Sequence, residues 1–158
     1  MVTALALTGA GPAKWPIFQT DGVSVRYPSG WHATSRPLTP VTYPPQVLAV
    51  ASFPLPREPQ TIGNNCGPAA TLARMPTTGA LILVLEHRAI RQVVFPTRPK
   101  RFRLSGFARY ECFGPSYLLR FHEAGRSFEI HVVFSPRVGP ATRVTVLRIL
   151  DSFRAKRT

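Results

Sequence analysis

Acidic residues are scarce in this sequence. Seven Asp and Glu stand against 20 Lys and Arg, so the formal net charge is +13. So few carboxylates leave little room for catalysis by paired acids, and no glycine-rich loop of the type that cradles phosphate occurs. The chain also lacks an apolar run of roughly 18 residues or more, the length that a membrane-spanning helix needs. These absences disfavour several common enzyme classes and an integral membrane protein.

The basic residues are mostly arginine and are spread along most of the chain. Such a charge attracts nucleic acid, anionic lipid or an acidic polymer of the cell envelope. The alternative is that arginine, alongside much Ala, Pro and Gly, reflects a GC-rich genome. The densest basic run should form one patch on a loop between two strands, and its members are Arg88, Arg91, Arg98, Lys100, Arg101 and Arg103. We expect this patch to bind an anionic partner, either a protein or a polymer. With only Phe95 and Phe102 as aromatic neighbours, it is a weak signal for nucleic acid.

The length of 158 residues predicts one globular domain with a sizeable core. Residues 1–20 read as a leader, because an apolar stretch that ends in small residues resembles the tail of a secretory signal. The domain itself is expected over residues 21–158. The protein is exported if the leader is such a signal, and cytoplasmic if it is not.

The segment 117–134 predicts an antiparallel hairpin. With Ala124 and Gly125 at the turn, Arg120 lies opposite Glu129, and a one-residue slip would turn every apolar side chain of the hairpin to water. One face is then apolar and carries Tyr117, Leu119, Phe121, Phe128, Ile130, Val132 and Phe134. The other face is polar and is expected to be a solvated sheet surface, and it carries Arg120, His122, Glu129 and His131.

The remaining elements complete an α+β pattern. Further strands are expected at 23–27, from 31, at 47–53, at 80–85 and at 102–113, the last with a kink at Gly106. A short helix should span 66–75, and an amphipathic helix should span 139–155. The apolar face of that second helix should cover the apolar face of the hairpin, and it carries Val146, Leu147, Ile149, Leu150 and Phe153. The predicted fold is a mostly antiparallel sheet of about six or seven strands with one short helix and one C-terminal helix.

Cys66 offers the sharpest chemical pattern. It begins the predicted short helix, where the helix dipole lowers a thiol pKa, and Gln60 precedes it at a spacing that lets an amide donate to an oxyanion. These residues resemble the Gln…Cys-Gly-Pro-Ala-Ala pattern of the papain-like peptidases that trim bacteriocin leaders. The resemblance implies a cysteine hydrolase in which His131 matches the family histidine and Asp151 is the only later acid.

Other readings of the cysteines and histidines stay open. A disulfide between Cys66 and Cys112 fits an even cysteine count in an exported protein. Two unpaired buried thiols are the other option. His122 and His131 share a face of the hairpin without lying opposite each other, so we predict no metal site.

The stretch VSVRYPSGW, residues 23–31, carries a wider resemblance. A strand that ends in Tyr-Pro-x-Gly-Trp, followed by irregular chain, an apolar strand, a meander and a C-terminal helix, resembles the PsbP-like and Mog-type α/β sandwich domains. The span 21–155 is also similar to uncharacterised actinobacterial proteins, which implies no activity. The resemblance implies a non-catalytic accessory or binding domain of an actinobacterial envelope, acting through protein partners and without a cofactor. The alternative function is the cysteine hydrolase.

Overall fold

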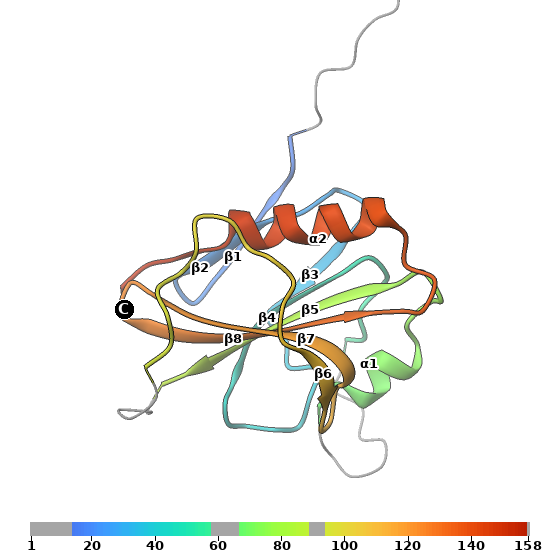
Figure 1. Cartoon of the computed structure of the whole chain (residues 1–158), viewed down its shortest axis with the longest axis horizontal. Helices are drawn as coiled ribbons and strands as arrows, with labels where there is room; N and C mark the ends of the chain where they lie inside the picture. Colours follow the sequence, from blue (N-terminus) through green and yellow to red (C-terminus); the bar gives the residue numbers. More distant parts are fainter. Residues whose placement is uncertain (1–13, 58–66, 89–93, 158) are drawn as a thin grey trace, which may run out of the picture.

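The computed structural model describes residues 14–57, 67–88 and 94–157. Within these ranges the chain forms two antiparallel sheets and two helices (Figure 1). The elements are β1 Ile17–Thr20, β2 Val23–Arg26, β3 His32–Thr34, β4 Gln46–Ala51, α1 Ala69–Ala73, β5 Ala80–His87, β6 Phe107–Tyr110, β7 Gly114–Glu123, β8 Arg126–Phe134, α2 Pro140–Ser152 and β9 Arg154–Ala155. The described residues contain no helix that is long and apolar enough to cross a membrane.

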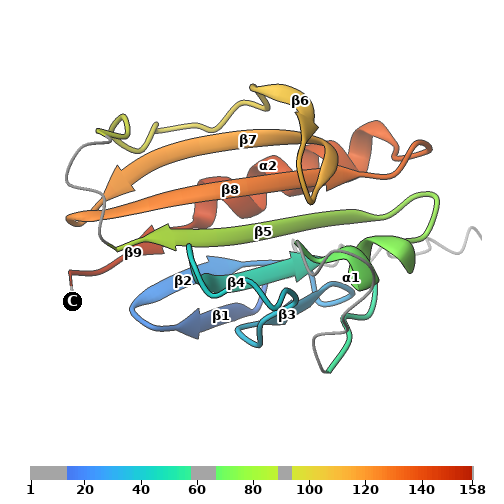
Figure 2. The ribbon, with the colours of Figure 1, turned by 90° about the horizontal axis from the view of Figure 1, so that it is seen from below.

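The larger sheet has six strands in the order β3-β4-β5-β8-β7-β6, and every neighbouring pair is antiparallel (Figure 2). Strand β5 lies inside the sheet, between β4 and β8. Its sequence ALILVL places apolar side chains on both faces, and all six of these residues are buried. A strand that is apolar on both sides needs cover on both faces, so the sheet is packed on each side.

The β7–β8 hairpin has the predicted register. Arg120 pairs with Glu129, Phe121 pairs with Phe128, and the pairing extends from the turn to Tyr117 and Val132. The two turn residues, Ala124 and Gly125, have φ values of 54° and 77°. Two consecutive positive φ values match the twist of the flanking strands, as in a type I′ turn.

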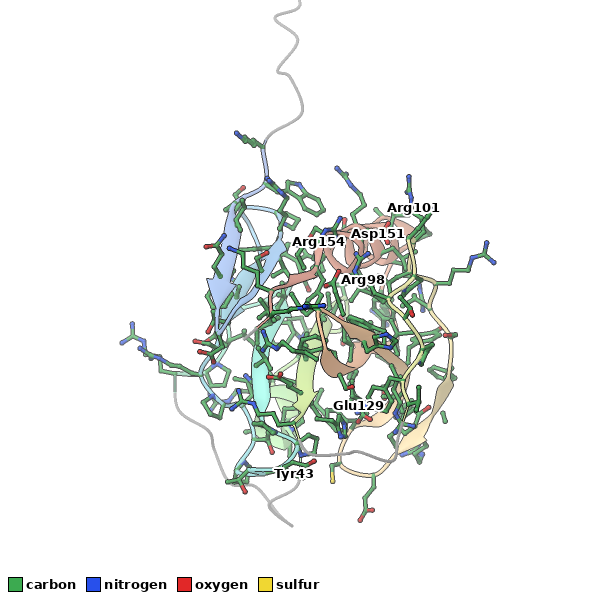
Figure 3. The ribbon with its side chains drawn as sticks, turned by 90° about the vertical axis from the view of Figure 1, so that its left-hand side faces the viewer. Tyr43, Arg98, Arg101, Glu129, Asp151 and Arg154 are labelled. Carbon is green, nitrogen blue, oxygen red and sulfur yellow. The ribbon has the colours of Figure 1, made fainter. Side chains whose placement is uncertain are left out.

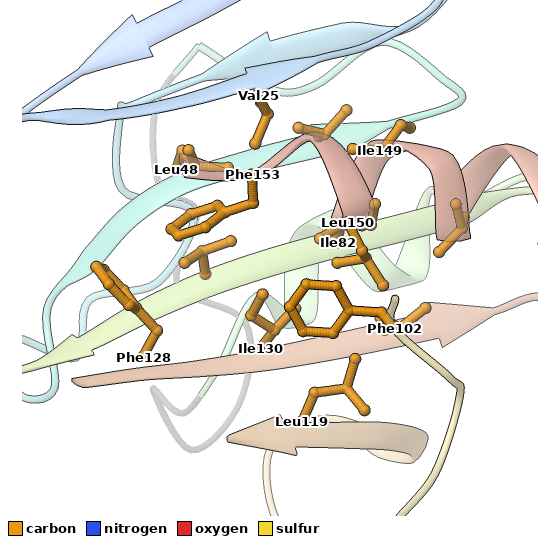
Figure 4. Close-up of a cluster of buried hydrophobic side chains, with 14 of the residues drawn as sticks. Val25, Leu48, Ile82, Phe102, Leu119, Phe128, Ile130, Ile149, Leu150 and Phe153 are labelled. Carbon is orange, nitrogen blue, oxygen red and sulfur yellow. The ribbon is translucent and has the colours of Figure 1, made fainter. Parts of the chain in front are cut away.

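One face of the large sheet packs against α2 and the small sheet β1-β2-β9 (Figure 1). Phe153, directly after α2, lies between the two hairpin aromatics, with ring centroids 5.5 Å from Phe121 and 5.0 Å from Phe128. Figure 4 shows Leu150 directly above Ile82, and Phe153 at the end of α2 on the side of Phe128. The prediction that the apolar face of the C-terminal helix covers the hairpin is therefore confirmed.

The opposite face of the sheet is also covered, which corrects the expectation of a solvated surface. Val133 and the odd-numbered leucines of β5 form a second core with residues of the 38–57 segment, α1 and Phe113. Within this layer Glu129 and His131 are buried, with 9% and 3% of their surface exposed. Alternation alone identified which side chains share this face, but it did not reveal the irregular chain that covers them.

Three predicted boundaries are wrong. The expected strand 102–113 is a strand only at β6, because the chain before it crosses β7 closely at Gly106, which has a φ of 65° and lies against the Leu118 carbonyl. The segment assigned to a leader contributes β1 to the small sheet, while residues 1–13 lie outside the described residues. The C-terminal helix ends at Ser152, and the two residues of β9 pair with β2.

Candidate anion-binding site

One pocket gathers basic side chains from four separate segments: β2, the chain before β6, α2 and β9. Its volume is about 690 Å³. Its basic members are Arg26, Lys100, Arg101, Arg148 and Arg154, and its acid is Asp151. The formal charge of this lining is five minus one, or +4. We call this set of six residues the basic pocket.

Arg154, which follows α2 in β9, caps the C-terminal end of that helix. Arg154 Nη1 donates to the carbonyl oxygens of Asp151 at 2.8 Å and of Phe153 at 2.6 Å, which satisfies carbonyls that the helix leaves unpaired. The Asp151 carboxylate accepts a hydrogen bond from the backbone N–H of Phe102 at 2.8 Å and lies 3.8 Å from Arg101 Nη1. Asp151 therefore docks the 94–106 segment onto the helix and offsets one of the five positive charges, which leaves the net charge of +4.

Arg98 belongs to the predicted basic patch but turns inward beneath it (Figure 3). Its side chain is only 10% exposed, with Nη2 donating to the Asp151 carbonyl at 2.7 Å and Nε lying 3.6 Å from Glu123 Oε1. Burial lowers the pKa of Arg98, and the nearby Arg154 lowers it further, whereas Glu123 and Asp151 act in the opposite direction. Arg98 thus fixes the 94–106 segment to α2 and leaves the pocket surface to its neighbours.

The other side of the basic pocket is built by β2 and α2. The backbone N–H of Arg26 donates to Ser152 Oγ at 2.8 Å, which ties the strand to the helix. The guanidinium of Arg148 stacks 4.5 Å above the ring of Trp15, a cation–π contact that restrains a long side chain. Arg101, in contrast, is 88% exposed and reaches into solvent. The pocket therefore combines restrained and freely accessible cations.

The other members of the predicted patch lie elsewhere. Arg103 lines a neighbouring hollow with Arg120. Arg88 follows β5 and pairs with Glu86, its Nε 3.2 Å from the carboxylate. Arg91 lies outside the described residues. Of the six predicted residues, the structure thus brings Lys100 and Arg101 to the basic pocket.

The predicted hydrolase residues are described only in part. Cys66 and Gln60 lie outside the described residues. The His131 ring is stacked on Phe113 with centroids 3.6 Å apart, and its Nε2 lies 3.0 Å from Glu129 Oε1. Asp151, the acid that the resemblance implied, belongs to the basic pocket instead. His131 is therefore enclosed in the second core with Glu129 as its acidic neighbour.

Cys112 is not a free thiol. Gly67, the residue after Cys66, has a φ of 63° and lies so close to the Cys112 carbonyl that a Cβ there would overlap it. The chain next to Cys66 therefore runs directly along Cys112, as a bridge between the two cysteines requires. Because Cys66 is outside the described residues, the Cys66–Cys112 disulfide stays a prediction.

The described residues contain no group of three or more His, Cys, Asp or Glu side chains that could hold a metal ion. His122 is held by the 94–106 segment, with Nδ1 2.6 Å from the Phe95 carbonyl oxygen and Nε2 3.4 Å from Thr97 Oγ1. His122 pairs with Ser127 across the hairpin, and His131 pairs with Leu118. His122 therefore contacts the 94–106 segment, whereas His131 contacts Phe113 and Glu129.

No family model, curated protein or solved structure matches this chain. Sequence reasoning missed Arg26, Arg148 and Arg154, because each is an isolated charge on a different element. The alternating pattern Val-Ser-Val-Arg and the polar side of the helix pattern both placed such charges at the surface, but no local signal shows that the surfaces meet.

Proposed function

We propose that this protein is a non-catalytic binding domain that holds an anionic partner at the basic pocket. The observation that carries the proposal is the convergence of five basic side chains from four segments around one hollow that contains one acid. A concave site lined by charges of one sign concentrates its field and raises the local concentration of oppositely charged ligands. The overall charge of +13 adds attraction at longer range.

The chemistry of the lining favours a multiply charged partner. Four of the five cations are arginines, whose planar guanidinium groups bind phosphate, sulfate or carboxylate through paired hydrogen bonds. The described lining contains no histidine or cysteine, while Asp151 and Ser152 are engaged with backbone groups. These features support binding of an anionic polymer or an acidic protein rather than a reaction on it.

Heparin is a suitable probe for this proposal. We expect the unmodified protein to bind it with an affinity that falls steeply with salt, because bound cations release counterions from a polyanion. The double variant Arg101→Gln/Arg148→Gln should bind at least tenfold more weakly at moderate salt, with a shallower dependence on salt concentration. Titration of labelled heparin at several salt concentrations measures both quantities.

A charge-matched control separates the pocket from the net charge. Arg36 and Arg74 are exposed and do not line the basic pocket. The variant Arg36→Gln/Arg74→Gln therefore loses the same two charges and should keep most of the affinity. Equal losses in the two double variants would show that binding follows only the overall charge, and the proposal would then be wrong.

We also infer that the fold is related to the PsbP-like and Mog-type sandwich domains. The inference rests on the order of elements after Tyr27-Pro28, with an antiparallel sheet and a C-terminal helix on one of its faces. Those domains act through partners, in line with a binding role.

Thiol counting distinguishes the binding domain from the alternative cysteine hydrolase. Alkylation of the unfolded, unreduced protein should modify no cysteine, because the proposed Cys66–Cys112 bridge leaves no thiolate to act as a nucleophile. Modification of two cysteines, with rapid labelling of Cys66 in the folded protein, would instead support the hydrolase.

A further inference from the structure

A second surface, on the outer edge of the large sheet, has the features of a peptide-binding site. Strand β6 pairs with β7 on one side, and no described strand pairs with its other side (Figure 2). The backbone groups of β6 that point away from β7, which belong to alternate residues, are therefore available to form a ladder with an added strand. Phe107, the first of them, leaves 63% of its surface exposed, although it is a large apolar residue.

Phe107 forms one wall of an aromatic hollow. Its ring lies 4.9 Å from that of Tyr117, which in turn lies 6.0 Å from Phe134. Tyr117 pairs with both Phe107 and Val132, so the three side chains form one row across β6, β7 and β8. We call the hollow lined by Phe107, Tyr117, Val132, Phe134 and Arg143 the aromatic pocket.

The size and place of the aromatic pocket suit a single side chain. Its volume is about 280 Å³, slightly below the roughly 300–1,000 Å³ of sites that enclose whole small molecules. It opens beside an unpaired strand edge, where an added strand would direct alternate side chains onto the same face of the sheet. An aromatic side chain of such a strand has three aromatic rings to pack against.

The basic residues at the aromatic pocket indicate which residues should flank the aromatic side chain of the bound strand. The Arg143 guanidinium lies 4.5 Å above the Phe134 ring and donates to the Tyr117 hydroxyl at 3.4 Å, so it is held at the pocket wall. Arg109 is exposed on β6 and projects to the same face as Phe107, opposite Pro115 of the pocket lining. No acidic residue lines the pocket. The complement to two arginines around an aromatic hollow is an aromatic residue flanked by carboxylates.

We propose that β6 and the aromatic pocket bind an extended acidic peptide segment, which adds as a strand to β6 and inserts an aromatic side chain beside Arg143. This site is separate from the basic pocket, with which it shares no lining residue. Main-chain hydrogen bonds to β6 supply the geometry, and the aromatic and acidic side chains supply the selectivity.

Three labelled peptides test the selectivity. The probe Ser-Glu-Ser-Phe-Ser-Glu-Ser, blocked at both ends, presents Glu, Phe and Glu on one face of a strand. Replacement of its Phe by Ala, or of both Glu by Lys, should weaken binding at least tenfold in fluorescence anisotropy. Equal binding of the three peptides, or binding of none, would overturn the proposal.

Protein variants then locate the site. Phe107→Ser and Arg143→Gln should each weaken binding of the acidic Phe peptide at least fivefold, and their melting temperatures confirm that they are folded. The pocket variant Arg101→Gln/Arg148→Gln should bind this peptide as the unmodified protein does, which separates this proposal from the heparin result. An unchanged affinity in Phe107→Ser would overturn the site.

N-methylation of the peptide backbone tests whether the peptide adds to β6 as a strand. The edge of a strand that pairs with β6 uses the N–H groups of alternate residues. One set of alternate N-methyl groups should therefore abolish binding, and the complementary set should be tolerated. Tolerance of both sets would overturn the strand geometry.

Discussion

The two faces of the large sheet are buried by different means. Under α2, the face is apolar at its centre, where Phe121 and Phe128 pack against Phe153. On the opposite face, leucines and Val133 share the layer with the buried Glu129 and His131, and the half-exposed Arg120 pairs with Glu129 from the border of the layer. Apolar burial dominates the centre of the first face, where the buried ion pair of Glu86 with Arg126 lies at the edge, whereas the second face has a satisfied carboxylate, Glu129, inside its layer.

Glu129 shows how the polar face is satisfied. Its carboxylate accepts from Arg120 Nε at 2.8 Å and lies 3.0 Å from His131 Nε2 and 3.5 Å from His87 Nε2. Burial alone would raise the pKa of Glu129, but the hydrogen bonds from His131 and Arg120 outweigh it and lower that pKa to about 2. Acid should therefore act on stability through Glu129 on one face and, at the edge of the α2 face, through Glu86, whose pKa is lowered by its hydrogen bonds from Arg126, whereas cavities should act mainly through the α2 face.

The largest effect is expected from Phe128→Ala under α2. Phe128 is fully buried in contact with Phe121 and Phe153, so truncation leaves a cavity and should lower the free energy of unfolding by about 3–5 kcal/mol. Because no proton is involved, the loss should be the same at pH 7 and pH 5. Urea denaturation at the two pH values measures it.

Phe107→Ala is the matched control for this truncation. It removes the same atoms from a strand of the same sheet, but from a ring that is mostly exposed. Phe107→Ala should lower the free energy of unfolding by much less than Phe128→Ala does. Similar costs for the two variants would contradict the placement of the core under α2.

A smaller, pH-dependent effect is expected from Glu129→Gln on the opposite face. The pKa of Glu129 is about 2 in the folded protein, against an ordinary value near 4.3, so the unfolded state binds its proton more readily. The ionised form therefore contributes stability above about pH 4, of order 2–3 kcal/mol by linkage, and loses it as the pH falls towards 2. Glu129→Gln should lower the free energy of unfolding at pH 6. It should also reduce the fall of that free energy between pH 4 and pH 2.

The measurement is denaturation of both proteins between pH 6 and pH 2. Glu111→Gln, at an exposed position, is the control and should retain the acid dependence. If the free energy of unfolding of Glu129→Gln falls with pH as steeply as that of the unmodified protein, the hydrogen bonds of Glu129 do not control the loss of stability in acid.

The hairpin and the helix above it were predictable because each follows a strict period. In β7 and β8 the period of two fixes both faces, and in α2 the period of 3.6 fixes the residues that meet the sheet. The small sheet was missed, although Asp21-Gly22 is a strong hairpin signal and both residues do have positive φ. Two-residue β9 carries no detectable period at all.

Two of the five cations of the basic pocket could be predicted from the sequence. Lys100 and Arg101 belong to one dense run of charge, which a sequence displays directly. Arg26, Arg148 and Arg154 reach the same hollow because β2, α2 and β9 pack together, a consequence of tertiary structure. The inward turn of Arg98 is likewise set by Glu123 and by the Asp151 carbonyl, which no local pattern connects to it.

The smallest effect is expected at the turn between β7 and β8, the two strands that contribute side chains to both faces of the large sheet. Ala124 has a φ of 54°, a conformation that costs an L-residue roughly 1–2 kcal/mol and that Asn tolerates better. Ala124→Asn should therefore raise the free energy of unfolding by up to about 1 kcal/mol, or a melting temperature gain of roughly 2–4 °C for a chain of this size. Ala124→Val, with a branched Cβ in the same conformation, should lower it. Since the gain lies in the backbone, it should be equal at pH 7 and at pH 4, unlike the effect of Glu129→Gln. Thermal melts at both pH values test this, and an Asn variant no more stable than the unmodified protein would contradict the strained turn.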